Sequence, residues 1–244
     1  MRRASGPAVA AGLPGAGRTA MDAALAEAGI GPVFHAADAR EALRLLQAHE
    51  ADLVLADAVL PGMDGAALAG EIRGLRLNVQ PAVVLLRVPG CMLPGADRLA
   101  ALGAAVLEKP PDGAALTGAL EALAACPPPL PDDRAARLEA LLDALGVPEH
   151  PGRDCLREAV ALVWRDRRLL RPLRTGLYPE VSRRTGLTTA QVERAVRYAI
   201  DAAWRAGDLA QQHRLFGHTI DARRGKPTCG EMIARLADIL RWEE

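Results

Sequence analysis

A proline-rich stretch at residues 126–133 is the feature of this 244-residue sequence that most constrains its fold. Proline fixes its own backbone dihedral and biases the residue before it away from helix, so the stretch predicts a stiff, extended linker. Because a domain typically has roughly 100 to 200 residues, the length of the chain also favours two domains. We therefore predict one domain over residues 1–125 and a second over residues 134–244.

Short apolar runs alternate with amphipathic helical segments before the linker. The runs are Ala8–Ala11, Pro32–Phe34, Leu53–Ala56, Ala82–Leu86 and Ala104–Leu107. This alternation predicts an α/β domain with a doubly wound parallel sheet of five strands. Ligands of such sheets bind at the carboxyl ends of the strands, and Asp57 directly follows the third run. The sequence therefore predicts an exposed, reactive carboxylate at Asp57.

Two motifs at predicted strand ends resemble those of bacterial receiver domains. Asp52–Gly65 (DLVLADAVLPGMDG) resembles the phosphoacceptor region, and Glu108-Lys109-Pro110 resembles the lysine and proline that follow the fifth strand. The resemblance implies that Asp57 is the phosphoacceptor, that Lys109 contacts its carboxylate, and that a cis peptide bond precedes Pro110. It also implies a phosphotransfer protein or a histidine kinase as a partner.

Several positions that support phosphorylation depart from the receiver pattern. A receiver holds Mg²⁺ with an acidic pair after the first strand. This sequence has Gly12 and Leu13 there, and the next acid, Asp22, lies inside the first predicted helix. Arg87 stands in place of the Ser or Thr that binds the phosphoryl group, and Val106 in place of the aromatic residue of the fifth strand.

These departures predict a receiver that folds but is not a competent Mg²⁺-dependent phosphoacceptor. We expect the guanidinium of Arg87 to pair with the Asp57 carboxylate and to hold the site in one state without phosphate. No cofactor is expected, and Mg²⁺ would bind only if the receiver is active.

Gly12–Thr19 (GLPGAGRT) supports a competing interpretation, because its spacing matches a phosphate-binding P-loop with Arg18 in place of the lysine. Leu53–Asp57 would then be the second nucleotide motif of an NTPase or of a nucleotide-responsive regulator. The planar guanidinium does not reproduce a compact ammonium group, however, and this interpretation leaves Leu60–Gly65 and Lys109 unexplained. Nucleotide binding is therefore the weaker alternative.

Apolar residues recur at helical spacing throughout the second half, which predicts an all-α domain. Residues 177–204 have the pattern of a helix-turn-helix DNA reader, in which Gly186 ends the first helix and Thr188 or Thr189 caps the second. The second helix would bury Val192, Ala195, Val196, Ala199, Ile200 and Ala203 and expose Gln191, Glu193, Arg194, Arg197 and Tyr198. Such polar side chains bind base edges and phosphates in a major groove.

Basic residues concentrate around this predicted reader, although the net charge of the chain is zero. Nine arginines and three acids lie between Trp164 and Arg197; the arginines are Arg165, Arg167, Arg168, Arg171, Arg174, Arg183, Arg184, Arg194 and Arg197. This surplus suits phosphate, so Arg183 and Arg184 join the predicted DNA-binding residues. One alternative is a solvated basic face; another is that Arg194 and Arg197 make only surface ion pairs and that the domain serves protein contacts.

The order of motifs over residues 134–244 resembles the effector domain of the sporulation initiation response regulators, the stage zero sporulation protein A family. These motifs are Leu145-Gly146-Val147-Pro148, Arg157-Glu158-Ala159-Val160, Leu177-Tyr178-Pro179-Glu180-Val181, Val192–Arg197, Ala203-Trp204, Phe216–Ile220 and Gly225-Lys226-Pro227-Thr228. The resemblance implies a transcription regulator that binds double-stranded DNA as a homodimer and contacts the RNA polymerase sigma subunit.

The predicted reading face matches that family only in part. Glu193, Arg194 and Arg197 match, whereas Ala190, Gln191 and Tyr198 stand where the family usually has serine, arginine and histidine. Arginine pairs with guanine, whereas glutamine pairs in bidentate fashion with adenine. We therefore expect Gln191 to exchange a contact to guanine for one to adenine, and the DNA box to differ. Cys229 and Gly230 also replace the usual polar pair after Thr228.

The remaining features limit the class of protein. The four cysteines lie far apart without the spacing of a zinc or redox motif, which fits a reducing cytoplasm. The sequence contains no run of ~20 apolar residues, so no membrane span is predicted. We expect neither a metal site nor an enzyme.

The main alternative to a DNA-binding regulator is a protein-interaction regulator that no longer binds DNA and forms mixed dimers with a paralogue.

Overall fold

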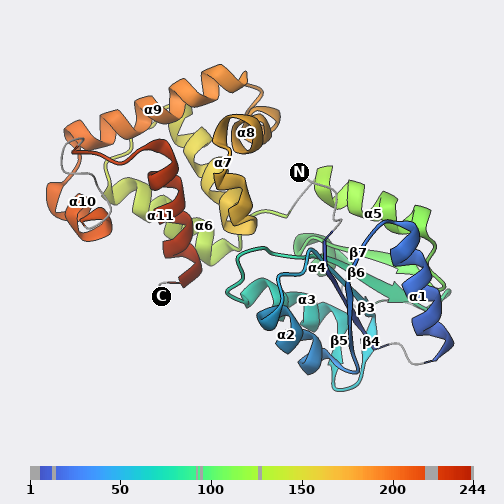
Figure 1. Ribbon diagram of the computed structural model, residues 1–244. Helices are drawn as coiled ribbons and strands as arrows, with labels where there is room; N and C mark the ends of the chain where they lie inside the picture. The colour runs from blue at the N-terminus through green and yellow to red at the C-terminus, as the bar shows by residue number, and fades with distance from the viewer. Residues whose placement is uncertain are drawn as a thin grey trace. The chain divides into compact units, whose positions relative to one another are not determined.

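The computed structural model describes residues 6–12, 15–91, 93, 96–125, 128–217 and 225–242, apart from the side chains of Ala16, Ala96 and Asp97. The chain forms two compact units, Met1–Pro129 and Leu130–Glu244 (Figure 1). The boundary between them falls inside the stretch predicted as a linker. Helix α6 already begins at Asp132, so the last two residues of that stretch belong to the first helix of the second unit.

A parallel sheet of five strands forms the first unit, as predicted. The strands are β1 (Ala8–Ala11), β2 (Val33–Ala36), β3 (Leu53–Asp57), β6 (Ala82–Arg87) and β7 (Ala104–Glu108), in the order β2-β1-β3-β6-β7. β2 extends further than predicted because its four residues pair one to one with those of β1. The carboxyl ends of β3, β6 and β7 are therefore neighbours at one edge of the sheet.

A short antiparallel hairpin follows β3 and was not predicted. Its strands are β4 (Val59–Leu60) and β5 (Met63–Asp64). Gly62 in the turn has a φ of 77°, a left-handed conformation that glycine adopts without steric cost. The hairpin turns the buried side chain of Leu60 toward the end of β1.

Helices cover both faces of the sheet. On one face lie α1 (Ala16–Glu27) and α5 (Gly113–Ala125), and on the other α2 (Ala39–Ala48), α3 (Gly65–Gly74) and α4 (Ala96–Ala101) (Figure 1). Successive side chains of a strand point to opposite faces. In β1, Ala8 and Ala10 accordingly pack with the core under α1 and α5, whereas Val9 and Ala11 pack with the core under α2 and α3.

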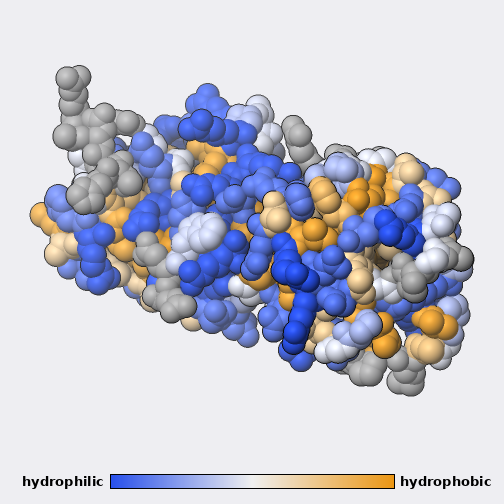
Figure 2. All heavy atoms as spheres, turned by 60° about the horizontal axis from the view of Figure 1, so that its bottom comes forward, coloured by the Kyte–Doolittle hydropathy of each residue, from blue (hydrophilic) through white to orange (hydrophobic). Residues whose placement is uncertain are grey.

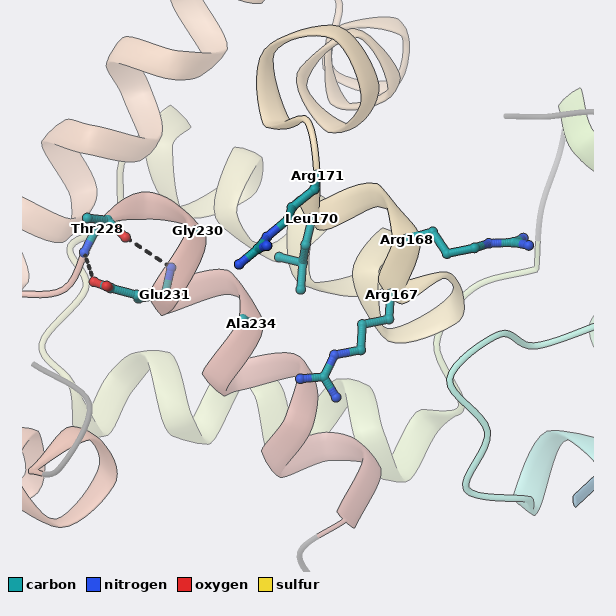
Figure 3. A pocket seen from close by; sticks show the side chains of 8 residues that line it. All are labelled: Arg167, Arg168, Leu170, Arg171, Thr228, Gly230, Glu231 and Ala234. Atoms are coloured by element: carbon teal, nitrogen blue, oxygen red, sulfur yellow. Dashed lines mark hydrogen bonds between the residues drawn. The ribbon is translucent and has the colours of Figure 1, made fainter. Parts of the chain in front are cut away.

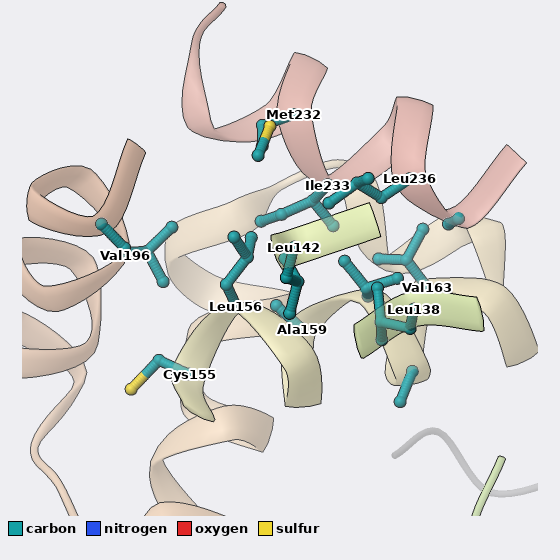
Figure 4. Close-up of a cluster of buried hydrophobic side chains, with 14 of the residues drawn as sticks. Leu138, Leu142, Cys155, Leu156, Ala159, Val163, Val196, Met232, Ile233 and Leu236 are labelled. Carbon is teal, nitrogen blue, oxygen red and sulfur yellow. The ribbon is translucent and has the colours of Figure 1, made fainter. Parts of the chain in front are cut away.

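The second unit is all-helical in its described residues, as predicted. Its helices are α6 (Asp132–Ala144), α7 (Pro151–Arg165), α8 (Tyr178–Thr185), α9 (Thr189–Ala206), α10 (Leu209–Phe216) and α11 (Cys229–Trp242), with two short helical turns, η1 (Arg167–Leu170) and η2 (Leu173–Leu177), between α7 and α8. Helix α7 is central and packs against α8, α9 and α11. Figure 4 shows the resulting core, to which α6, α7, α9 and α11 all contribute apolar side chains.

The surface view in Figure 2 shows hydrophilic side chains over much of the visible face, with hydrophobic side chains in separate patches between them. Within the described ranges, no helix is both long and apolar enough to cross a membrane. Cys91, Cys155 and Cys229 are free thiols, whereas Cys126 lies outside the described residues.

Candidate functional site

Asp57 and Lys109 meet at the carboxyl edge of the sheet, as the receiver resemblance implies. The Lys109 ammonium donates a hydrogen bond to Oδ2 of Asp57, and Oδ1 accepts a 3.3 Å bond from the Val59 amide. The side chains of Asp57 and Lys109 are only 18% and 24% exposed, so the pair is partly shielded from water. The peptide bond between Lys109 and Pro110 is cis, which confirms that expectation.

The predicted contact between Arg87 and Asp57 is wrong. Arg87 Nη2 instead donates a 2.7 Å bond to Oε1 of Glu108, and its Nη1 donates a 3.2 Å bond to the carbonyl oxygen of Cys91. The reason is the register of the sheet, which places Arg87 directly opposite Glu108 on adjacent parallel strands. The guanidinium of Arg87 therefore pairs with Glu108, while the carboxylate of Asp57 pairs with Lys109.

At the end of β1, Gly12 occupies the first of the two positions where a receiver has its acidic pair. Gly12 has a φ of 82°, and a Cβ on it would lie 3.3 Å from Cβ of Asp57 but only 2.1 Å from Cδ2 of Leu60. The space where an acidic side chain would lie beside Asp57 is therefore filled by an apolar one. Asp22 lies in α1, as predicted, and its Oδ1 is 3.2 Å from Nε2 of His35.

Two further observations bear on ligands of this domain. No group of three or more His, Cys, Asp or Glu residues in the described part of the chain is arranged to hold a metal ion. In the P-loop-like stretch, Leu13 and Pro14 lie outside the described residues, and Arg18 is exposed in α1.

Helices α8 and α9 form the predicted helix-turn-helix. Gly186 ends α8 in a left-handed conformation with a φ of 73°. Thr188 caps α9 through a capping box: its Oγ1 accepts a 3.3 Å bond from the Gln191 amide, and Gln191 Oε1 accepts a 2.8 Å bond from the Thr188 amide. Oγ1 of Thr188 also donates to the same Oε1. The start of α9 is thus held by its own first turn.

The apolar side of α9 is buried as predicted, apart from Ala195, which is half-buried. On the other side, Gln191, Arg194, Arg197 and Tyr198 are exposed as predicted, whereas Glu193, also predicted to be exposed, is half-buried. Arg194 has no hydrogen-bond or ion-pair partner among the described residues. The ring of Tyr198 contacts the ring of His150, with 4.6 Å between the ring centroids.

Glu193 lies between two arginines of this face. Its Oε1 accepts a 2.9 Å bond from Arg174 Nη2 and a 2.7 Å bond from Arg197 Nη2. The hydrogen bond from Arg174 holds the pKa of Glu193 below its usual value, and the charge of Arg197 acts in the same direction. Glu193 therefore stays ionised at neutral pH and orients both guanidinium groups. Sequence reasoning did not assign Arg174 this role, because the contact spans a whole helix.

The two arginines of α8 are engaged in ion pairs. Arg183 pairs with Glu180, and Arg184 Nη1 donates a 3.0 Å bond to Oε2 of Glu158 on α7. The second pair ties the helix-turn-helix to its central supporting helix. These two ion pairs neutralise part of the basic surplus.

Residues 226–229, which lead into α11, contact both helices of the helix-turn-helix. Cys229 is hydrogen-bonded to the buried Tyr178, and burial raises the pKa of the Cys229 thiol above its usual value. Lys226 pairs with Asp201 of α9 at 2.5 Å. The resemblance motif Phe216–Ile220 is described only to Gly217, because residues 218–224 lie outside the described ranges.

Known proteins match both halves of the chain. Residues 16–121 match the response regulator receiver domain family, and residues 138–240 match the family described as sporulation initiation factor Spo0A C terminal. Among solved structures, the signal receiver domain of a histidine kinase from Syntrophus aciditrophicus is 26% identical, over 49% of this chain and 89% of that chain, with a TM-score of 0.40.

Two other solved receivers are similar over the same half. The chemotaxis response regulator CheY4 of Vibrio cholerae is 24% identical over 48% of this chain and 98% of that chain, with a TM-score of 0.39. The receiver domain of a sensor histidine kinase from Pseudomonas aeruginosa is 24% identical over 48% and 94%, with a TM-score of 0.40. From the two family matches together, this chain belongs to the response regulators that join a receiver domain to a Spo0A-type, DNA-binding effector domain.

Proposed function

We propose that this chain is a cytoplasmic, sequence-specific transcription regulator whose receiver domain does not use Mg²⁺-dependent phosphorylation as its switch. The observation that carries the DNA-binding part is the polar face of α9, where Arg194 is exposed and Glu193 orients Arg197. Guanidinium groups held in this way donate paired hydrogen bonds to guanine edges and to phosphates.

The capping box limits the hydrogen bonds that the side chain of Gln191 can make to DNA. A bidentate contact with adenine needs both the amide nitrogen and the carbonyl oxygen of the side chain. Oε1 of Gln191 already accepts hydrogen bonds from the amide and the hydroxyl of Thr188. Gln191 therefore offers its amide N–H groups alone and acts as a single donor to a base acceptor or a phosphate.

The expected partners follow from this role. We propose that the chain binds double-stranded DNA as a homodimer, contacts the polymerase sigma subunit and receives its signal from another protein. The alternative function is a regulator that has lost DNA binding and acts by forming mixed dimers with a paralogue. The pairing of Arg183 and Arg184 with acids is the observation that favours this alternative.

Selection of bound DNA from a random pool tests the first part. The full chain should recover a single box from about 50 to 200 mM salt, since base contacts persist while purely electrostatic binding falls steeply. Arg194→Ala should bind this box at least tenfold more weakly and select a different consensus. A chain that recovers no consensus and loses all DNA as salt rises would instead support the mixed-dimer alternative.

The arrangement of the receiver site supports the second part of the proposal. Lys109 occupies one oxygen of Asp57, and Leu60 fills the space beside Gly12 where a magnesium ligand would project. The acyl-phosphate reaction needs a divalent cation to neutralise the transferring phosphoryl group. These residues supply no second carboxylate for it.

Incubation with radiolabelled acetyl phosphate and Mg²⁺ tests this second part directly. Labelling should stay at the level of the Asp57→Ala variant, and Asp57→Asn should leave DNA affinity unchanged. Stoichiometric labelling that requires both Mg²⁺ and Asp57 would overturn the proposed control. Addition of ATP or GTP to the same samples should not raise the melting temperature, which also tests the nucleotide alternative.

A further inference from the structure

A hollow of about 600 Å³ lies between η1 and the start of α11 in the effector domain (Figure 3). Arginines from η1 and the residue after it line one side, and the first turn of α11 lines the other. The principal lining residues are Arg167, Arg168, Arg171, Thr228, Gly230 and Glu231. The hollow is separate from the exposed face of α9.

The three arginines of the hollow differ in their partners. Arg167 donates a 3.0 Å bond to Asp238, and Arg168 donates a 2.9 Å bond to Asp166. Arg171 is exposed and its guanidinium has no hydrogen-bond or ion-pair partner in the described part of the chain. Figure 3 shows Arg171 directed toward the start of α11, whereas Arg168 points away.

The first turn of α11 does not itself provide the site. Thr228 and Glu231 form a capping box, in which Oγ1 of Thr228 accepts a 3.2 Å bond from the Glu231 amide and Oε2 of Glu231 accepts a 2.7 Å bond from the Thr228 amide. The only acidic group of the lining is thus turned to the backbone. The positive charge at this hollow comes from the arginines.

The hollow is connected to the reading face through shared neighbours. Leu173 of η2 reaches Gly230, since its Cδ1 lies 3.4 Å from where a Cβ of Gly230 would be. The next residue, Arg174, binds Glu193 of α9. Cys229, between two lining residues, is hydrogen-bonded to Tyr178 at the start of α8. A ligand in the hollow would therefore lie close to the helix-turn-helix.

From this arrangement we propose that the hollow binds a phosphate of the DNA backbone, outside the base pairs that α9 reads, with Arg171 as its main ligand. The inference rests on the proposed DNA-binding function. A guanidinium fork matches the geometry of phosphate oxygens. Backbone contacts of this kind position a reader on the duplex without adding sequence preference.

Salt titration of DNA binding by the full chain tests the proposal. Arg171→Ala should bind the selected box and random DNA more weakly by the same factor, without change in the selected consensus. The loss of one phosphate contact lowers the salt slope by about 0.9, so between 50 and 200 mM salt the wild-type affinity should fall about 3.5-fold more than that of the variant. Arg171→Lys should keep most of the slope, because it retains the charge.

Arg44→Ala is the matched control, since it removes an exposed arginine of α2 in the receiver domain. It should leave the slope unchanged. Wild-type and Arg171→Ala chains with the same melting temperature exclude a folding defect. An unchanged slope in Arg171→Ala overturns this inference alone, whereas a wild-type chain that binds no DNA overturns the proposed function as well.

Inorganic pyrophosphate distinguishes a free phosphate ligand from the DNA backbone. If pyrophosphate raises the melting temperature of wild type but not of Arg171→Ala, and the DNA salt slopes of the two chains are equal, the hollow binds a small phosphate and the DNA assignment is wrong. If the slopes differ as expected, the DNA assignment stands.

Discussion

Replacement of Gly152 by alanine tests how closely helices α7 and α9 pack against each other. Gly152 lies in the first turn of α7, and a Cβ there would be 2.2 Å from the carbonyl oxygen of Ala195 and 3.0 Å from Cβ of Ala199, both on α9. Favourable contacts between non-bonded heavy atoms lie at about 3.5–4.0 Å. The two helices would therefore have to move apart by about 1 Å at their crossing.

The expected cost follows from two opposing effects. Forcing an extra methyl group into a packed site typically costs about 1–3 kcal/mol. Alanine is preferred over glycine inside a helix by up to about 1 kcal/mol, and less than that in the first turn. We expect the effector domain to lose about 1–2 kcal/mol, which lowers its melting temperature by roughly 5–10 °C for a domain of this size.

Gly118→Ala on α5 is the control, because a Cβ at Gly118 meets nothing within 4 Å. This substitution should stabilise the receiver domain by about 0.5–1 kcal/mol. Calorimetry reports the melting of both variants, and fluorescence anisotropy reports their binding to the selected DNA box. Gly152→Ala should bind more weakly because α9 is displaced. If Gly152→Ala melts at or above wild type while Gly118→Ala behaves as expected, the close approach of α7 and α9 is refuted.

Three other variants test individual contacts. Thr188→Ala removes the capping box of α9 and should cost about 1 kcal/mol, measured as a lower melting temperature of the effector domain. Glu193→Gln weakens the bonds to Arg174 and Arg197; the melting temperature should change little because the pairs are solvated, whereas random-DNA affinity and its salt slope should rise. Because the pKa of Glu193 is lowered in the folded chain, its small stabilisation is complete above the unfolded pKa of about 4.3 and is lost as the pH falls through the lowered value, so any difference in melting temperature between wild type and Glu193→Gln should shrink as the pH falls below about 4.3. Arg241→Met removes bonds of a buried guanidinium to two carbonyl oxygens at the end of α7 and should cost about 3 kcal/mol; chemical denaturation that shows no loss would contradict this role.

Local patterns predicted much of the fold because each depends on residues close together in the chain. Apolar runs of three to five residues indicated the five strands; the structure left the first run unchanged and moved the ends of the others by only one or two residues. Gly186 and Thr188 marked the turn between α8 and α9 because a left-handed C-cap and a capping box each need only a few neighbouring residues. The hairpin after β3 was missed because two-residue strands have too few residues for a periodic pattern.

Patterns along the chain are enough to predict the two-domain plan, the parallel sheet, the helix-turn-helix and the exposed arginines of α9. The pairing of charged groups, Arg87 with Glu108 and Arg174 with Glu193, became visible only in the folded chain. The same holds for Leu60, which fills the space beside Gly12. Periodicity and capping are properties of consecutive residues, whereas the partner of a side chain depends on strand register and helix packing that bring distant segments together.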